Sequence, residues 1–477
     1  MVPTLVQHLQ RLAQGYRGFH TPGHHRGRGA PEVLRRWWGD ALFQADLSEI
    51  PGLDNLAQPE GLLREAQAQV ASIFGAEYSW FLVNGATAGV LAALLAVYRP
   101  GGKVILPRQV HQSVIHGLIL TGAEPVWLLP TWDENRQVWG GITPAQLAAT
   151  LQQVGPEQVT AVVLSSPSYK GVCGPVGECV AMAHHYGIPV IVDEAHGAHF
   201  PFHPQLPASA LQLGADMVIH STHKVLTSLT QSALLHLQGG RVSLRRVQQC
   251  LNLIQTTSPS YLLLASLVAT AEQMAAQGEQ LYGALLERLE RLTQQIHRLP
   301  GYGVLAIDPH RPGFAAQDPT RLVIQTRRLG WTGFALDERL YQQYQIIAEY
   351  PDYGDVTFLL TPWHDDGDGQ ALLNALAALA QVPPGPTPLP PVPLPPPASA
   401  VISPREAFFA PQTLVPWTEA VGQVSAQVVS PYPPGIPVLL PGEMITAEIV
   451  EYLTLVQQLG GQLVGVAGPQ LAVVSNW

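Results

Sequence analysis

The chain has 477 residues, of which 47% are hydrophobic and only 13% are charged, and its formal net charge is −10. This length corresponds to roughly two to four domains, and the apolar composition excludes an intrinsically disordered chain. No basic tract is present, so nucleic acid is not an expected partner. Three cysteines, Cys173, Cys179 and Cys250, are too few for a disulfide framework and fit a reducing compartment.

Membrane and export signals are weak in this sequence. The N-terminus has no long apolar core, so no signal peptide is expected. The longest apolar runs, near 90–98 and 261–271, are about ten residues long, whereas a membrane-spanning helix needs about 20. We therefore expect a soluble, cytoplasmic protein.

Residues 1–298 show two successive patterns, an irregular one and then an alternation of predicted strands and helices. Residues 1–60 carry many turn signals and are expected to form an irregular N-terminal segment, which a helix at 60–74 follows. Over 61–298 short apolar runs alternate with helical patterns, which predicts a large α/β domain with a mostly parallel sheet. Strands are expected at 80–83, 104–106, 125–129, 161–164, 189–192, 217–219 and 232–237, and helices at 88–98, 114–120, 144–154, 177–186, 207–213 and about 243–298.

The remainder of the chain divides at a proline-rich stretch. Residues 299–382 are expected to form a small α+β domain, with strands at 322–325 and 356–360 and helices at 333–343 and 369–379. Ten prolines fall within residues 383–397, which favours an extended polyproline II spacer over a ligand for a proline-binding module. The linker is placed at 383–400, and residues 401–477 are predicted to form a small C-terminal domain.

A glycine-containing turn follows the first strand of the large domain. Asn84-Gly85-Ala86-Thr87-Ala88-Gly89 opens a helix, and its small residues let backbone N–H groups approach an anion. Thr87 adds a hydroxyl. The motif is neither a P-loop nor a dinucleotide fingerprint, and a plain turn at the start of a helix remains an alternative.

Three further motifs lie at the ends of predicted strands. Asp193 ends an apolar strand, where a carboxylate can hold a protonated pyridine nitrogen or simply cap the next helix. Lys224 follows another strand in His220-Ser221-Thr222-His223-Lys224, and it is one of only three lysines among 25 basic residues. A lysine amine there can form a Schiff base, while Ser221 and His223 can bind phosphate. His111, after a third strand, can stack on an aromatic ring.

A phosphate loop, an acid for a pyridine nitrogen, a stacking imidazole and a Schiff-base lysine are together the requirements of pyridoxal 5′-phosphate (PLP). Their order and their positions at strand ends match a fold-type-I PLP-dependent enzyme. The alternative of a surface lysine in an ordinary loop carries less weight, because lysine is so rare in this chain.

The motifs also resemble those of the Orn/Lys/Arg decarboxylase family of fold-type-I PLP enzymes, in its short form without the extra N-terminal domain. The resemblance covers nearly the whole chain. It rests on Phe19-His20-Thr21-Pro22-Gly23-His24, Leu53-Asp54-Asn55-Leu56, Pro107–Ser113, Pro167-Ser168-Tyr169-Lys170-Gly171, Val192–Gly197, Ser221–Lys224, Ser228–Gln231, Thr257–Tyr261, Ser403–Phe409 and Pro431–Pro437.

This resemblance implies a function and a set of residue roles. The chain would decarboxylate lysine, arginine or ornithine to the corresponding di- or polyamine, with this small-molecule amino acid substrate as its partner. It would act as a cytoplasmic homodimer or higher homo-oligomer in polyamine metabolism. Lys224 would carry PLP, Asp193 would pair with the pyridinium nitrogen, His111 would stack on the ring, and Ala195 and His196 would lie beside the cofactor. Gly85, Ala86, Thr87, Ser221 and His223 would surround the phosphate. Glu349 matches an acidic position near the distal amine of the substrate.

Some residues depart from the family pattern and keep other functions open. The usual Gly-Thr-Ser phosphate loop is Gly85-Ala86-Thr87 here, which removes one hydroxyl. A transaminase or lyase reaction with PLP, or a PLP-binding protein without turnover, therefore remains an alternative. A metal hydrolase is a more distant one, built on Asp193, Glu194, His196, His199 and His203 or on His20, His24 and His25; it leaves Lys224 unexplained, and no metal is predicted. The sequence does not choose among the three basic amino acids.

Overall fold

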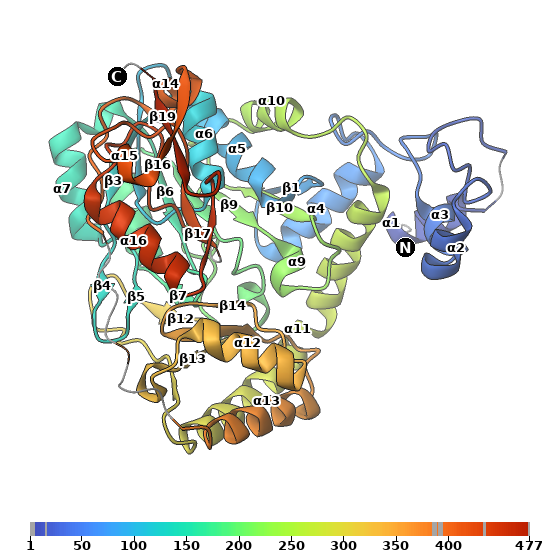
Figure 1. Cartoon of the computed structure of the whole chain (residues 1–477). Coiled ribbons are helices and arrows are strands. Elements are labelled where there is room, and N and C mark those ends of the chain that lie inside the picture. Colours follow the sequence, from blue (N-terminus) through green and yellow to red (C-terminus); the bar gives the residue numbers. More distant parts are fainter. Residues whose placement is uncertain (1–4, 15–16, 384–388, 390–394, 433–435, 476–477) are drawn as a thin grey trace. The chain divides into compact units, whose positions relative to one another are not determined.

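The computed structural model describes residues 5–14, 17–383, 389, 395–432 and 436–475. The chain divides into two compact units, which are described separately (Figure 1). The first unit contains residues 1–97 and 189–279, and the second contains residues 98–188 and 280–477. Most of the proline-rich linker at 383–400 and part of the motif at 431–437 lie outside the described residues.

The first unit contains four neighbouring strands in the order β1-β10-β9-β8. β8 and β9 are parallel, whereas β10 is antiparallel to both of its neighbours, β9 and β1. β1, β8 and β9 therefore point the same way, and their carboxyl ends lie at one edge. The elements are α1 (Leu5–Leu12), α2 (Glu32–Trp38), α3 (Asp40–Ala45), α4 (Leu62–Phe74), β1 (Tyr78–Leu82), α5 (Gly85–Val97), β8 (Val190–Asp193), a 3₁₀ turn (Phe200–Phe202), β9 (Met217–His220), α9 (Thr222–Val225), β10 (Ala233–Leu237), α10 (Leu244–Ile254) and α11 (Tyr261–His297), which enters the second unit after Glu279.

Helix α5 lies directly against these strands because it carries a glycine on the facing side. A Cβ atom at Gly89 would stand 2.7 Å from Leu82 of β1 and 3.1 Å from Ile219 of β9. Only a residue without a side chain permits so close an approach of helix and sheet. The start of α5 is thereby fixed beside the ends of β1 and β9.

The second unit contains a parallel layer, a small antiparallel sheet and a C-terminal part. In the parallel layer β2 lies between β6 and β3 and is parallel to both, so the carboxyl ends of β2 and β6 also share an edge. The elements of this layer are β2 (Lys103–Pro107), α6 (Gln112–Thr121), β3 (Glu124–Leu128), β4 (Trp132–Asp133), β5 (Val138–Trp139), α7 (Pro144–Val154), β6 (Val159–Ser165), β7 (Val172–Cys173) and α8 (Val176–His185), with a 3₁₀ turn at Pro156–Gln158.

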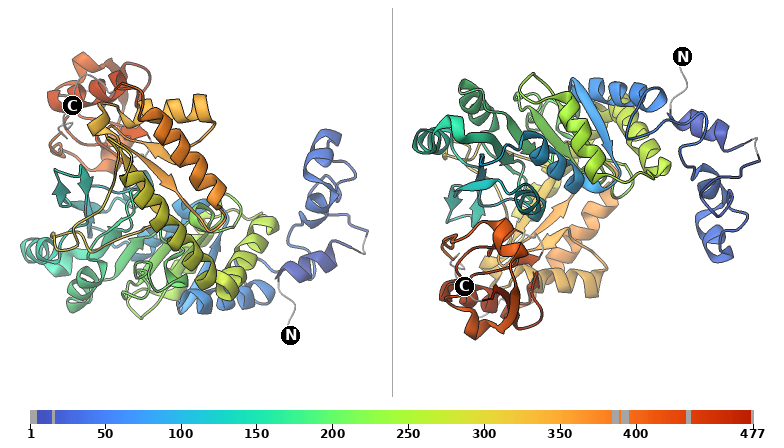
Figure 2. Two further views of the ribbon diagram at one scale, coloured as in Figure 1. Left: turned by 90° about the horizontal axis from the view of Figure 1, so that it is seen from below. Right: turned by 90° about the horizontal axis from the view of Figure 1, so that it is seen from above.

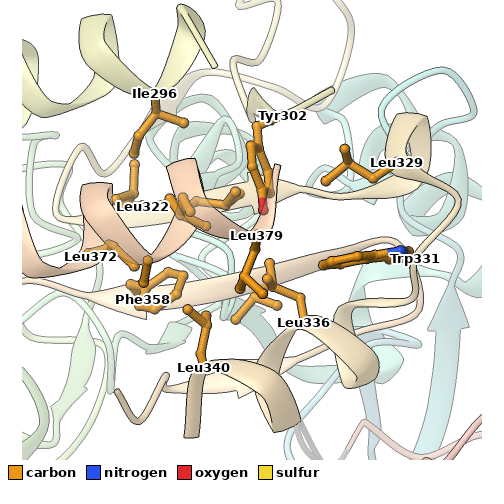
Figure 3. Close-up of a cluster of buried hydrophobic side chains, with 14 of the residues drawn as sticks. Ile296, Tyr302, Leu322, Leu329, Trp331, Leu336, Leu340, Phe358, Leu372 and Leu379 are labelled. Carbon is orange, nitrogen blue, oxygen red and sulfur yellow. The ribbon is translucent and has the colours of Figure 1, made fainter. Parts of the chain in front are cut away.

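The small sheet has the order β11-β13-β15-β14 and is antiparallel throughout. Its elements are β11 (Gly303–Val304), β12 (Ala316–Gln317, paired with β7), β13 (Arg321–Gln325), α12 (Gly333–Tyr344), β14 (Tyr350–Pro351), β15 (Asp355–Leu359) and α13 (Asp366–Leu379), with a 3₁₀ turn at Arg327–Leu329. Leu322, Leu336, Phe358 and Leu372 are among the side chains that pack between this sheet and its helices (Figure 3). Helix α13 runs alongside the last turns of α11 (Figure 2), where Arg291 lies 3.6 Å from Asp366.

The C-terminal part has its own core around Trp417, Leu439, Ile449 and Leu471. Its elements are α14 (Pro404–Phe409), β16 (Gln412–Pro416), α15 (Trp417–Ala420), β17 (Ser430–Tyr432), α16 (Ala447–Gln458), β18 (Gln462–Val464) and β19 (Gln470–Val474). β16 pairs with β19 and β17 pairs with β18, both antiparallel. No helix among the described residues is both long and apolar enough to cross a membrane.

The α/β class with a mostly parallel sheet is confirmed, and three local predictions are wrong. No helix forms at 207–213, where isolated turn hydrogen bonds such as Leu213 N–H to Ser209 O (3.0 Å) replace a helical ladder. The helical stretch predicted at about 243–298 is interrupted after Ile254, where Pro259 precedes the start of α11. The N-terminal segment, expected to be irregular, contains the three short helices α1, α2 and α3.

Candidate active site

Three loops of the first unit meet at the carboxyl edge of β1, β8 and β9. Asp193 is the register partner of Ile219, so the loop that follows β9 begins beside the end of β8. Leu82 is paired with Ala233 and His220 with Leu234, which places the ends of β1 and β9 on either side of the start of β10. The glycine turn, Asp193 and Lys224 therefore emerge at the same edge, as the sequence predicts for a ligand site in an open α/β sheet.

The start of α5 has the properties of an anion site. Gly85 has a φ of +71°, and an added Cβ would meet only the backbone oxygen of Gln231, at 4.0 Å. The first turn of α5 contains no acidic residue, and the N–H groups of a first turn have no acceptor within their helix. Gly85 N–H donates to Gln231 O (2.9 Å), which ties this turn to the loop before β10. Thr87 is exposed, and Ala86 adds no polar group.

Asp193 lies at the end of β8 with its carboxylate partly exposed. One of its oxygens, Oδ1, accepts a hydrogen bond from the backbone N–H of Ala195 (3.2 Å). This bond fixes the side chain and leaves the carboxylate with further acceptor capacity. A carboxylate in this position suits a protonated ring nitrogen.

The Lys224 side chain lies in the short helix α9, just beyond the end of β9. Its Nζ atom is 3.0 Å from Nε2 of His196, and His196 is buried. Lys224 itself is only partly buried. An amine held beside an imidazole can exchange a proton with it, which is what a lysine that forms and releases covalent bonds needs.

Ser221 and His223 lie in the same segment as Lys224, at the start of α9. Ser221 is buried at the start of α9, and the Nδ1–H group of His223 donates to Ser232 O (2.8 Å). Burial lowers the pKa of His223, and the neighbouring Lys224 lowers it further. The neutral ring therefore presents Nε2 as an acceptor, and this atom must gain a proton before it can bind a phosphate oxygen.

His111 and Glu349 belong to the second unit and are described there by their own surroundings. His111 follows β2 and caps the start of α6: its Nδ1 atom accepts from Ser113 N–H (3.2 Å) and lies 2.8 Å from Ser113 Oγ. These contacts orient a half-buried ring. Glu349 has an exposed side chain just before β14, and its backbone N–H donates to Thr357 O (3.0 Å).

A buried chain of hydrogen bonds, not predicted from the sequence, crosses the four strands of the first unit. It links Ser79 Oγ to His236 Nδ1 (2.6 Å), His236 Nε2 to His220 Nδ1 (3.1 Å) and His220 Nε2 to Glu194 Oε2 (2.7 Å). With Glu194 ionised, every donor points toward its carboxylate, and both histidines are neutral. Glu194 Oε1 also accepts from Ala210 N–H (2.8 Å). This bond helps to hold the backbone at Glu194, the residue that follows Asp193.

We expect this buried chain to make folding stability depend on pH. Burial lowers the pKa of His220 from 6.5 to about 3, and it also lowers the pKa of His236. Below about pH 6.5 the unfolded protein therefore binds two protons that the folded protein does not, so the free energy of unfolding falls as the pH falls. Burial raises the pKa of Glu194, so the folded protein can bind one proton there that the unfolded protein does not. This proton opposes the effect of the histidines on stability, but it is one proton against two.

The variant His236→Phe removes one of these two histidines. Urea unfolding between about pH 5 and 7.5 should show a shallower fall in stability than in the unchanged protein, by about one proton taken up on unfolding. The variant will be less stable at every pH, because Ser79 Oγ and His220 Nδ1 each lose a buried hydrogen-bond partner. If the free energy of unfolding has the same slope against pH in both proteins, His236 does not have a lowered pKa in the folded state.

Metal binding finds no support in the histidine clusters. Within the described ranges, no group of three or more His, Cys, Asp or Glu side chains could hold a metal ion. Glu194 is engaged with His220, and His24 contacts Asp46 (3.1 Å). The lysine and aspartate at the strand edge therefore remain the reactive groups to be explained.

The α/β fold, a glycine turn at a helix start, a carboxylate and a partly buried lysine at one sheet edge are typical of the class of fold-type-I PLP-dependent enzymes. Comparisons with known proteins agree with this class. Profiles of the Orn/Lys/Arg decarboxylase family match residues 2–335 (major domain) and 397–468 (C-terminal domain). The arginine decarboxylases of Bacillus subtilis and Halalkalibacterium halodurans are each 36% identical to this chain, over 91% of it and 89% of their own length. The chain belongs to the Orn/Lys/Arg decarboxylase family.

Solved structures show the same fold. The lysine decarboxylase of Francisella novicida superposes with a TM-score of 0.85 at 19% identity, covering 99% of this chain and 80% of the other. The constitutive lysine decarboxylase of Escherichia coli gives a TM-score of 0.85 at 19% identity, covering 99% and 82%. The serine palmitoyltransferase of Sphingomonas wittichii gives 0.54 at 17% identity, over 68% and 77%.

Proposed function

We propose that this chain decarboxylates a basic L-amino acid with PLP bound to Lys224, and that arginine is the substrate. The observation that carries the proposal is the amine of Lys224. It belongs to one of three lysines in the chain, and it lies 3.0 Å from His196 at the edge that also carries Asp193 and the start of α5. Membership of the decarboxylase family supports the reaction.

The groups at this edge fit PLP one by one. The phosphate suits the open N–H groups at the start of α5, where a Cβ at Gly85 has free space, together with Ser221. The ring nitrogen suits the carboxylate of Asp193, and the aldehyde carbon suits the amine of Lys224. The family resemblance assigns the ring face to His111, which belongs to the second unit. When bound, PLP supplies an electron sink for the pair left on Cα after the carboxylate departs.

The residues of the chain perform the proton chemistry. The reaction breaks the bond between Cα and the carboxylate, releases carbon dioxide and puts one proton on Cα, so one proton is consumed for each amine formed. Lys224 and His196 are 3.0 Å apart and can deliver that proton in sequence. Asp193 keeps a proton on the ring nitrogen because its negative charge favours the cationic form.

Arginine is favoured over lysine by the relatives. Arginine decarboxylases match at 34–36% identity over more than nine-tenths of this chain, whereas a lysine decarboxylase of Pseudomonas aeruginosa matches at 28% over 57% of it. Glu349, an exposed carboxyl side chain, is the proposed partner of the distal cation of the substrate. The homodimer, the cytoplasmic location and a place in polyamine metabolism stay predictions of the family resemblance.

The test is a substrate panel with a matched pair of glutamate variants. The purified protein with PLP should absorb near 420 nm and release trapped carbon dioxide fastest from arginine, more slowly from lysine or ornithine. Glu349→Gln should raise KM for arginine about tenfold with a smaller effect on kcat, because it removes a charge that binds substrate and transition state alike. Glu338→Gln changes another exposed glutamate, on α12, and should leave both constants near their original values.

The outcomes separate the remaining alternatives. An absorbance band without gas from any of the three amino acids would point to another PLP reaction or to a PLP-binding protein without turnover. The absence of a band would remove Lys224 from its proposed role. Equal effects of the two glutamate variants would remove Glu349 from the substrate site.

A further inference from the structure

A buried arginine connects the loop that carries His111 to the C-terminal part of the chain. Arg108 lies directly after β2 and is 7% exposed. Its Nη1 donates to Pro437 O (2.9 Å), and its Nη2 donates to Val438 O (3.0 Å) and to Glu443 Oε2 (3.0 Å). One guanidinium thus has acceptors on three residues, all of which fall in the segment that matches the C-terminal domain of the family.

The other side of this link is equally buried. Glu443 is 2% exposed, and its Oε2 atom also accepts from Leu440 N–H (2.8 Å). Burial raises the pKa of Glu443, and the charge of Arg108 opposes that effect. The guanidinium carbon of Arg108 lies 5.6 Å from the ring centre of Trp127 on β3. The link is therefore enclosed on all sides, unlike an exposed surface ion pair.

Such a buried pair contributes little net stability, since removing two charges from water offsets most of their attraction. What it does provide is orientation, because a planar fork fits its acceptors in only one arrangement. Arg108 stands three residues before His111, and its own backbone N–H donates to Leu128 O (2.7 Å). The local bonds to Ser113 fix the His111 ring on α6, but they do not fix the loop in which it lies.

We propose that the C-terminal domain positions the active-site loop: Glu443 and the carbonyls of Pro437 and Val438 hold Arg108, and Arg108 holds His111 at the place where the cofactor ring is to bind. Arg108 and Glu443 are positioning residues, since neither is assigned a contact with substrate or cofactor. What His111 contacts rests on the proposed function, whereas the link itself rests on the hydrogen bonds of Arg108 alone.

The same domain supplies a matched control at the other end of α6. Arg405 of α14 donates through Nη1 to Ile119 O (2.9 Å) and Leu120 O (2.7 Å), in the last turn of α6. Helix α14 lies beside α6 (Figure 1). Loss of Arg405 therefore weakens the attachment of the C-terminal domain to the same helix, but far from His111.

The test compares Glu443→Gln with Arg405→Gln in the full chain, since each removes one charge of the C-terminal domain and leaves a polar side chain in its place. Glu443→Gln should raise the dissociation constant of PLP about tenfold, because an unfixed loop must be ordered on binding. In the cofactor-free protein it should also speed hydrogen exchange of the amides of residues 108–113 about tenfold. Arg405→Gln should speed exchange at residues 119–122 and leave the PLP dissociation constant within about twofold.

A second variant tests the same proposal if Glu443→Gln fails to fold. Arg108→Lys retains a cation beside Glu443 but not the forked donors, and it should show the same two changes to a smaller degree. The proposal is overturned if Glu443→Gln or Arg108→Lys leaves both measurements unchanged, or if Arg405→Gln weakens PLP binding equally. If the unchanged protein binds no PLP, the proposed function fails, while the exchange measurement still decides the link.

Discussion

Lys224→Ala is expected to abolish the absorbance near 420 nm and to lower carbon dioxide release by at least about a thousandfold. The variant removes the amine at the end of β9, and no other residue there can form a carbon–nitrogen double bond with the cofactor. Its imidazole neighbour His196, 3.0 Å away, cannot replace the amine. Absorbance titration with PLP and trapped carbon dioxide are the two measurements.

A charge-preserving variant shows whether the loss of activity comes from the lost covalent chemistry of Lys224 or from its lost charge. Lys224→Arg keeps a cation at the same place, but a guanidinium stays protonated and cannot act as the nucleophile. It should lose activity as completely as the alanine variant. Because Lys224 is only partly buried, both variants should unfold at urea concentrations close to that of the unchanged protein. Turnover retained by either one would remove Lys224 from the reaction.

Lys170→Met is expected to destabilise the protein by about 3–5 kcal/mol, because it leaves a buried carboxylate without its cation. Lys170 lies in the loop between β6 and β7, and its Nζ is 2.8 Å from Asp352 Oδ2 and 2.8 Å from Asp355 Oδ2. Burial alone would lower the pKa of Lys170, but the two aspartates outweigh it and raise that pKa. Burial raises the pKa of Asp355 to about 6 even with Lys170 present.

Two further variants isolate the cause of this destabilisation. Lys103→Met removes another of the three lysines, whose Nζ lies 3.9 Å from the mostly exposed Glu124, and should change the free energy of unfolding by less than about 0.5 kcal/mol. The double variant Lys170→Met with Asp355→Asn should regain at least about half of the loss, since the unpaired charge is gone. Urea unfolding measures all three, and a loss below about 1 kcal/mol in Lys170→Met would contradict the buried-charge argument.

The Lys170 cluster also bears on the site, because Asp352 and Asp355 flank the turn between β14 and β15. Glu349 stands directly before β14, so the same hairpin carries the proposed partner of the substrate's distal cation. Tyr169, next to Lys170, packs edge-on against Tyr350 with ring centres 6.0 Å apart. Loss of Lys170 should therefore raise KM in addition to lowering stability.

The fold class and the strand ends at which the candidate residues lie could be predicted from the sequence alone. Alternation of short apolar runs with helical patterns predicts strand ends at one edge, and Asp193 and Lys224 stand where those strands end. The scarcity of lysine points to Lys224, and the same count points to Lys170, which the sequence places only within a motif. Such local features suffice because strand direction and residue chemistry are written in consecutive residues.

Only the tertiary structure decided the partners that lie far apart in the chain. Arg108 meets Glu443 across 335 positions, Lys170 meets Asp355 across 185, and Ser79 meets His236 across 157. No periodicity or spacing reports such pairs, because they depend on how sheets and loops pack. Burial then changes their chemistry: it lowers the pKa of His220 and raises that of Glu194, although both residues look like ordinary polar positions in the sequence.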